Sequence, residues 1–312
     1  MTLQRSGVVT SLVTPFTAQA DAVGGTELDL HGIEALVRAQ LRAGVGAIAV
    51  AGWIGEGPTL SRIERRTLLD VAREASRGRI EVLAHVGTSD TAKSIALAVD
   101  AEAAGADAVI VVTPPYSKPN ANGFRSHILS IADNTKLPVY LEFDPDRTRT
   151  PVTARDMSSL MAIEGIIGVI DHSANALHVE CLCAVGREEV FLTASEANSL
   201  ASLAVGGHGI FSAVANVSPV CVVEMEAAWR NGDHDRARQI HQGLMPLIQL
   251  IEEEGVAALK HAMTSKFKMA DAVRLPLVPL DEARTRQVDA AMEHTARMRM
   301  SIEDTRLLRF AR

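Results

Sequence analysis

Glu142 is the ionisable residue whose setting most suggests chemistry, because it lies in an otherwise apolar run from Pro138 to Phe143. Burial disfavours a charged carboxylate, so we expect its pKa to rise towards values useful in general acid–base catalysis. Asp144 follows two positions later, on the same face if the run is a strand. We therefore predict that Glu142 is an acid or base and that Asp144 contacts the substrate. The competing interpretation is a structural glutamate paired with Arg147.

Two histidines also lie at or next to the ends of apolar runs. His85 lies near the end of one run, and His172 follows another. Imidazoles exchange protons near neutral pH, so we predict that His172 assists Glu142; alternatively, both rings are structural and hydrogen-bonded. Imidazoles and carboxylates also bind divalent metals, but no H-E-x-x-H or similar spacing occurs. We predict no metal and no cofactor, and keep a metal-dependent aldolase as the least favoured hypothesis.

The composition narrows the class of protein. The chain has 312 residues, a net charge of −7, 47% hydrophobic and 4% aromatic residues. Interspersed charges of both signs give no reason to expect binding to nucleic acid or to a membrane. The three cysteines are an odd number, and no apolar run approaches the length of a membrane span. We expect a cytoplasmic protein with reduced cysteines.

Eight short apolar runs alternate with segments of helical spacing, and these elements must position the residues above. The runs cover residues 8–13, 46–51, 80–86, 108–113, 138–143, 166–170, 190–193 and 209–213. The segments with helical spacing cover 30–43, 61–77, 91–104, 122–134, 153–162 and 195–205. This alternation predicts a (β/α)₈ TIM barrel over residues 1–218. A purely helical pattern predicts that residues 219–312 form a C-terminal region packed on the barrel. An open doubly wound sheet is the alternative, but no G-x-G-x-x-G turn follows the first run.

The loops after the runs match one family in order along the chain. They are Thr14-Pro15-Phe16, Gly52-Trp53-Ile54-Gly55-Glu56, Gly87 to Thr91, Thr113 to Pro119, and Pro145-Asp146-Arg147-Thr148. With these motifs the chain resembles the dihydrodipicolinate synthase and N-acetylneuraminate lyase family over almost its whole length. The resemblance implies an oligomeric barrel, commonly a homotetramer, that condenses or cleaves 2-keto acids and aldehydes. It also implies a Schiff-base lysine on the sixth strand and a relay tyrosine on the fifth.

Several central positions depart from the pattern of that family. Ile170 stands at the lysine position and Glu142 at the tyrosine position, while Trp53 and Ile54 replace two threonines of the carboxylate-binding turn. No other lysine offers a plausible replacement. The lysines are Lys93, Lys118, Lys136, Lys260, Lys266 and Lys268.

Other positions of the family pattern remain. Tyr116 and Arg147 are retained. We predict Tyr116 as a further catalytic residue, although it could instead protrude at a subunit contact. The predicted substrate-binding residues are Trp53, Ile54, Asp144, Arg147 and Ile170.

Two classes of function follow from these residues. The first is a lyase, hydratase or hydrolase that works without a Schiff base on a small oxygenated metabolite, with Glu142 as acid or base. The second is a non-catalytic family member that binds a ligand or serves as a partner subunit. The expected partners are a small molecule and further copies of the chain, as a homodimer or homotetramer. We favour the enzyme, because a carboxylate in place of tyrosine is not typical of decay towards inert packing.

Overall fold

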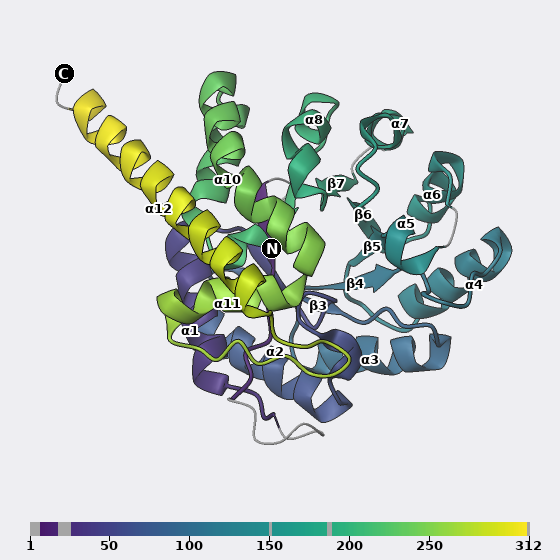
Figure 1. Ribbon diagram of the computed structural model, residues 1–312. Coiled ribbons are helices and arrows are strands. Elements are labelled where there is room, and N and C mark those ends of the chain that lie inside the picture. Colours follow the sequence, from purple (N-terminus) through teal and green to yellow (C-terminus); the bar gives the residue numbers. More distant parts are fainter. Residues whose placement is uncertain (1–6, 18–25, 150–151, 186–188, 311–312) are drawn as a thin grey trace.

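Eight parallel strands close into a barrel, in the order of the chain, in the computed structural model of this protein (Figure 1). The structure describes residues 7–17, 26–149, 152–185 and 189–310. The strands are β1 (Gly7–Ser11), β2 (Ala47–Val50), β3 (Glu81–His85), β4 (Ala108–Val112), β5 (Val139–Phe143), β6 (Ile166–Asp171), β7 (Val190–Thr193) and β8 (Gly209–Ser212). Strand β8 pairs with β1 and closes the sheet, so no edge remains unpaired. The predicted TIM barrel is confirmed.

The strands are buried on both faces, which explains their apolar sequences. One set of side chains fills the barrel interior and includes Leu83, Ile110, Tyr140, Ile170 and Phe211. A second, larger set packs between the strands and the surrounding helices. Because side chains alternate along a strand, Tyr140 in the interior places Glu142 on the inward face of β5.

Helices separate the strands and surround the barrel in Figure 1. Those that follow β1 to β7 are α1 (Leu30–Ala43), α2 (Arg62–Ser76), α3 (Thr91–Ala103), α4 (Ala121–Ala132), α5 (Pro145–Thr148), α6 (Ala154–Met161), α7 (Ala176–Val185) and α8 (Ser199–Ala204). Two helix caps agree with the sequence prediction. Ser61 and Glu64 form an N-terminal capping box on α2, and Gly44 ends α1 as a C-terminal cap in the left-handed conformation. Helix α7 was not predicted, because apolar residues lie all around it and leave no amphipathic signal.

Four helices follow β8, in agreement with the purely helical pattern of this region. They are α9 (Pro219–Arg230), α10 (His234–Glu254), α11 (Val256–Phe267) and α12 (Glu282–Phe310). Helix α9 contacts β1, β8 and α1, as an outer helix of the barrel does, while α12 lies across α10 and α11 (Figure 1). The division at residue 218 therefore stays a prediction, since α9 packs like part of the barrel.

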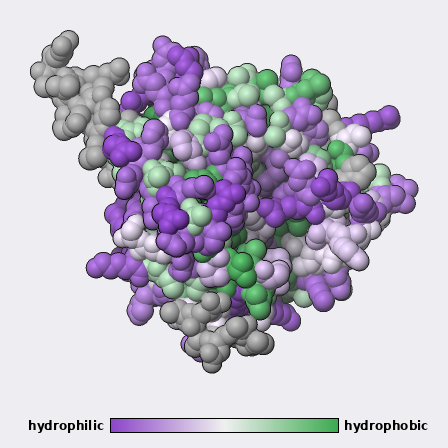
Figure 2. Space-filling view, in the orientation of Figure 1, coloured by the Kyte–Doolittle hydropathy of each residue, from purple (hydrophilic) through white to green (hydrophobic). Residues whose placement is uncertain are grey.

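Most of the molecular surface visible in Figure 2 is hydrophilic, with hydrophobic areas scattered over it. Within the described residues, no helix combines the length and the apolar character that crossing a membrane requires.

Candidate active site

A cavity of about 760 Å³ lies among the loops that follow β2 to β5. This volume falls in the usual range of small-molecule sites, and the C-terminal end of the strands is where TIM barrels carry their active sites. Its ionisable lining residues are Arg62, Arg65, His85, Lys93, Glu142, Asp144 and Arg147. Trp53, Leu60, Leu97 and Val112 contribute apolar surface. The cavity is therefore lined by groups of both charges on an apolar frame.

Glu142 lies at the end of β5 and is held between two imidazole rings. Its Oε1 is 2.9 Å from Nε2 of His172, which follows β6, and its Oε2 is 3.4 Å from Nδ1 of His85, the last residue of β3. Only 3% of the Glu142 side chain is exposed. Strands β3, β5 and β6 thus bring together one carboxylate and two imidazoles that are far apart in the sequence.

The histidines reverse the pKa shift expected for Glu142 from its burial. Burial raises the pKa of a carboxyl group, but the charge and hydrogen bonds of His85 and His172 outweigh it and hold the pKa of Glu142 below its ordinary range. For His172, burial lowers the pKa, yet the hydrogen bond and charge of Glu142 raise it above the ordinary value of 6.5. The prediction of a raised pKa for Glu142 is wrong, because its partners were not visible in the sequence. Both pKa shifts favour the charged pair, a Glu142 carboxylate and a His172 imidazolium.

Gly52 fixes the position of His85 from the other side. A Cβ atom built on Gly52 would lie 2.5 Å from Nε2 of His85, so the ring packs directly on the glycine backbone. Nε2 of His85 is buried and has no hydrogen-bond partner within the described residues, and the same holds for Nε1 of Trp53. Buried polar atoms without partners are uncommon, and here both belong to residues that line the cavity.

Asp144, Arg147 and Trp53 form one wall of the cavity. Asp144 caps the short helix α5 by accepting a hydrogen bond from the backbone N–H of Arg147 at 3.0 Å. Its carboxylate also pairs with the Arg147 side chain at 3.2 Å. The Arg147 guanidinium stacks 3.5 Å above the Trp53 ring, a cation–π contact. The alternative of a Glu142–Arg147 ion pair is therefore wrong, because Arg147 pairs with Asp144.

The other predicted site residues lie outside the cavity lining. His172 lies behind Glu142 and positions it. Ile54 is 1% exposed and packs in the core between barrel and helices, and Ile170 is buried in the barrel interior. Tyr116 is 96% exposed. None of these three side chains lines the cavity, so the substrate-binding roles of Ile54 and Ile170 and the catalytic role of Tyr116 stay predictions.

Four ionisable residues that line the cavity were not predicted as part of the site: Arg62, Arg65, His85 and Lys93. His85 was considered as a proton shuttle, and its place at the end of a predicted strand was the available signal. Arg65 on α2 and Lys93 on α3 carried no such signal, because a charged helix residue is ordinarily solvated. Only the packing of α2 and α3 beside the loops turns these two side chains towards the cavity.

The described part of the chain contains no group of three or more His, Cys, Asp or Glu side chains arranged to hold a metal ion. The two histidines around Glu142, His85 and His172, both pair with its carboxylate.

Comparison with known proteins places the chain in one family. The sequence profile of the dihydrodipicolinate synthetase family matches residues 4–295. A 4-hydroxy-tetrahydrodipicolinate synthase of Bradyrhizobium diazoefficiens is 36% identical over 290 residues, covering 92% of this chain and 96% of the relative. One of Sorangium cellulosum is 36% identical over 293 residues, covering 93% and 96%.

Solved structures agree with the sequence comparison. The 4-hydroxy-tetrahydrodipicolinate synthase of Methylacidiphilum fumariolicum superimposes with a TM-score of 0.90 at 27% identity, covering 96% of this chain and 98% of the other. The dihydrodipicolinate synthase of Thermotoga maritima gives 0.88 at 30% identity, covering 93% and 98%. The barrel, the order of its loops and these matches lead to one conclusion: the chain belongs to the dihydrodipicolinate synthetase family of aldolases and lyases.

Proposed function

We propose that this chain is a lyase-type enzyme that makes or breaks a bond beside an oxygenated carbon of a small metabolite by acid–base catalysis, without a Schiff base at the β6 position. The observation that carries this proposal is the buried Glu142 carboxylate, which lines the cavity and is held by His172 and His85. A buried carboxylate with two imidazole partners can exchange a proton with a bound ligand.

The residue at the β6 position supports a mechanism without a covalent intermediate. Ile170 has no nucleophilic atom, and the family resemblance assigns the Schiff-base lysine to this position. The one lysine in the described lining of the cavity is Lys93, on α3, whose side chain is exposed. A Schiff-base lysine functions best when burial or a nearby cation lowers its pKa, and exposure provides no such burial.

The charges of the pair suggest the direction of proton transfer. Since the pKa of His172 is raised and that of Glu142 is lowered, the resting site holds its proton on His172. His172 first passes its proton to the Glu142 carboxylate and becomes a neutral imidazole. The Glu142 carboxylic acid formed in this way then donates that proton to a ligand atom that becomes more basic during reaction. The reverse movement removes a proton from the ligand. Glu142 contacts the ligand in this scheme, and His172 is a positioning residue and proton reservoir.

The first experiment tests the absence of a Schiff base. The purified protein is incubated with pyruvate and borohydride, followed by intact mass measurement and peptide mapping, beside a family member that is labelled under the same conditions. We expect no stable adduct on this chain. An adduct on Lys93, or on any other lysine, would overturn the non-covalent mechanism.

The second experiment tests the acid–base role. The assay measures turnover of a panel of 4-hydroxy-2-oxo acids and 2-keto acid–aldehyde pairs by three proteins: wild type, Glu142→Gln and Glu74→Gln. Glu74→Gln is the control, because Glu74 is exposed on α2. General acid–base groups contribute about 10²–10⁴-fold in rate, so Glu142→Gln should lower kcat by at least 10² while Glu74→Gln leaves it unchanged. Turnover that survives in Glu142→Gln would contradict the mechanism. Binding without turnover in the wild type would instead indicate a non-catalytic ligand-binding protein.

A homodimer or homotetramer remains part of the proposal. Tyr116 and Ile63 are 96% and 80% exposed in the single chain, and large apolar or aromatic side chains are typical of subunit contacts. Sedimentation or light scattering should give a multiple of 33.3 kDa, and a monomer at micromolar concentration would refute this part. The cytoplasmic location also stays a prediction.

A further inference from the structure

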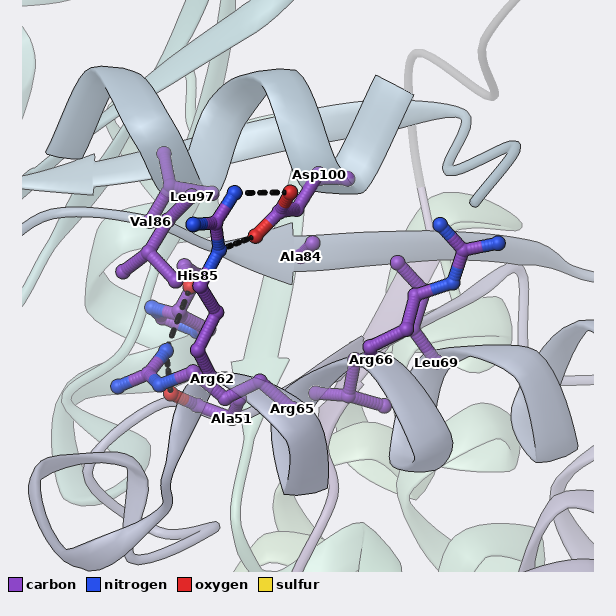
Figure 3. A pocket seen from close by; sticks show the side chains of 12 residues that line it. Ala51, Arg62, Arg65, Arg66, Leu69, Ala84, His85, Val86, Leu97 and Asp100 are labelled. Carbon is purple, nitrogen blue, oxygen red and sulfur yellow. Dashed lines mark hydrogen bonds and ion pairs between the residues drawn. The ribbon is translucent and has the colours of Figure 1, made fainter. Parts of the chain in front are cut away.

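The part of the cavity beside α2 and α3 carries positive charge that no carboxylate neutralises. Arg62, Arg65 and Lys93 all line the cavity there. Arg62 is neutralised, because its guanidinium forms two hydrogen bonds with the carboxylate of Asp100 (Figure 3). No carboxylate within the described residues lies within ion-pair distance of Arg65 or Lys93. Arg65 is partly buried, and buried charges are ordinarily paired, so Arg65 together with the exposed Lys93 leaves an opening for an anion.

The hydrogen bonds of Arg65 leave donors available. Its side chain lies in a small hollow that continues the cavity, and its guanidinium reaches the carbonyl oxygens of Ala51 and His85 (Figure 3). A third bond of 2.6 Å joins it to the carbonyl oxygen of Gly57. A guanidinium has five N–H donors, so two remain for a further acceptor. The carbonyl contacts also fix the orientation of the guanidinium.

The charges at the opposite end of the cavity are balanced. Glu142 is matched by the His172 imidazolium, and Asp144 is matched by Arg147. The excess positive charge is thus confined to the α2–α3 end. A cavity of about 760 Å³ also leaves room for a ligand larger than a three-carbon acid.

We propose that Arg65 and Lys93 form a subsite for a carboxylate or phosphoryl group, carried by the same molecule whose reacting carbon meets Glu142. This assignment rests on the proposed function for the placement of the reacting end, but the anion subsite can be tested by itself. The substrate is then an anionic, oxygenated metabolite with its charged group remote from the reacting carbon. Trp53 and Leu97 line the cavity with apolar surface for the chain between the two ends.

The test uses inorganic phosphate and glutarate as probes, with neutral glutaramide as the uncharged control. Calorimetric titration compares wild type, Lys93→Gln, Arg65→Lys and the control Lys136→Gln, an exposed lysine outside the cavity lining. We expect phosphate, glutarate or both to bind wild type and glutaramide not to bind. Lys93→Gln should weaken binding about threefold to fivefold, because the charge is partly solvated. Arg65→Lys keeps the charge but loses the planar fork, and about tenfold weakening is expected.

A second readout locates the bound probe even if Arg65→Lys fails to fold. Acetylation of lysines with a water-soluble N-hydroxysuccinimide ester, mapped by peptide mass, should slow at Lys93 when the probe is bound and stay unchanged at Lys136. Absence of binding by both anions, or binding that Lys93→Gln leaves unchanged, would overturn the subsite.

Failure of the subsite and failure of the proposed function are distinguishable. Glu142→Gln should retain the affinity for the probes while losing turnover. If it retains turnover as well, the acid–base role falls and the subsite stands. If the probes fail to bind while Glu142→Gln loses turnover, the acid–base role stands and the subsite falls.

Discussion

Replacing Lys260 with methionine should destabilise the fold strongly, because Lys260 joins the C-terminal helices to the turn after β2. Its Nζ donates to the Glu56 carboxylate and to the carbonyl oxygen of Ala272 at 2.7 Å. It also lies 4.0 Å from the centre of the Phe16 ring. The Lys260 and Glu56 side chains are 2% and 1% exposed, so water cannot replace either partner.

The expected magnitude follows from the charge that is left behind. Removing one partner of a buried ion pair costs about 3–5 kcal/mol, since the other charge stays buried and unpaired. In Lys260→Met, Glu56 would keep the backbone N–H of Arg274 at 2.8 Å as a donor, which favours the lower half of that range. The carbonyl of Ala272 also loses a donor, at about 1–3 kcal/mol, and these costs overlap. We expect a loss of about 4 kcal/mol in the free energy of unfolding.

Replacing both partners should cost less than replacing Lys260 alone. Burial lowers the pKa of Lys260 to about 8 despite the charge of Glu56, so desolvation outweighs the attraction. The double variant Lys260→Met/Glu56→Gln removes both charges and should recover at least half of the loss. Because the folded pKa lies below the unfolded value of 10.5, wild type should also gain stability relative to Lys260→Met as the pH rises from about 8 to 10.5.

Urea unfolding measures these differences. Fluorescence of Trp53, close to the turn, and Trp229, on α9, should be followed together with far-UV circular dichroism. Coincident transitions would show that a single free energy of unfolding is meaningful. Lys136→Met is the control, since its side chain is exposed. A loss below about 1 kcal/mol in Lys260→Met, or a double variant less stable than the single one, would refute the reasoning.

Three further predictions concern the site and its surroundings. Gly52→Ala should displace the ring of His85 and lower turnover at least tenfold. The control Gly123→Ala should stay active, because a Cβ atom there meets ordinary contacts of 3.4 Å. Equal turnover numbers for the two variants would contradict this. By NMR, the pKa of the His172 ring should lie above 6.5 in the wild type and below 6.5 in Glu142→Gln. Without the Glu142 charge, less remains to offset the lowering of the pKa by burial. An unchanged titration midpoint would disprove the coupling. Burial raises the pKa of Glu196 to about 7, above its ordinary value of 4.5, so the wild type should lose stability as the pH rises from 4.5 to 7. The Glu196→Gln variant does not titrate at this position and should lose less. Melting temperatures that fall in parallel for the two proteins over this pH range would contradict the prediction.

The sequence was sufficient for the barrel, because the signals that define it are local. Apolar runs such as Val190 to Thr193 and the capping box of Ser61 and Glu64 act within a few residues, and each appears in the structure where it was predicted. The same locality explains the omission of α7, whose apolar residues give no periodic signal. Strand alternation placed residues 140, 142 and 144 on one face, and the structure shows that this face points into the barrel.

Only the tertiary structure decided the electrostatics of the site. The pKa of Glu142 depends on His85 and His172, which reach it from strands β3 and β6, more than 25 residues away in either direction. Arg65 and Lys93 likewise become site residues only because α2 and α3 pack beside the cavity. Charge interactions depend on distance in space and on the exclusion of water, and neither quantity is encoded in local spacing. The sequence by itself therefore determined which strand carries the carboxylate, and the fold decided which charges surround it.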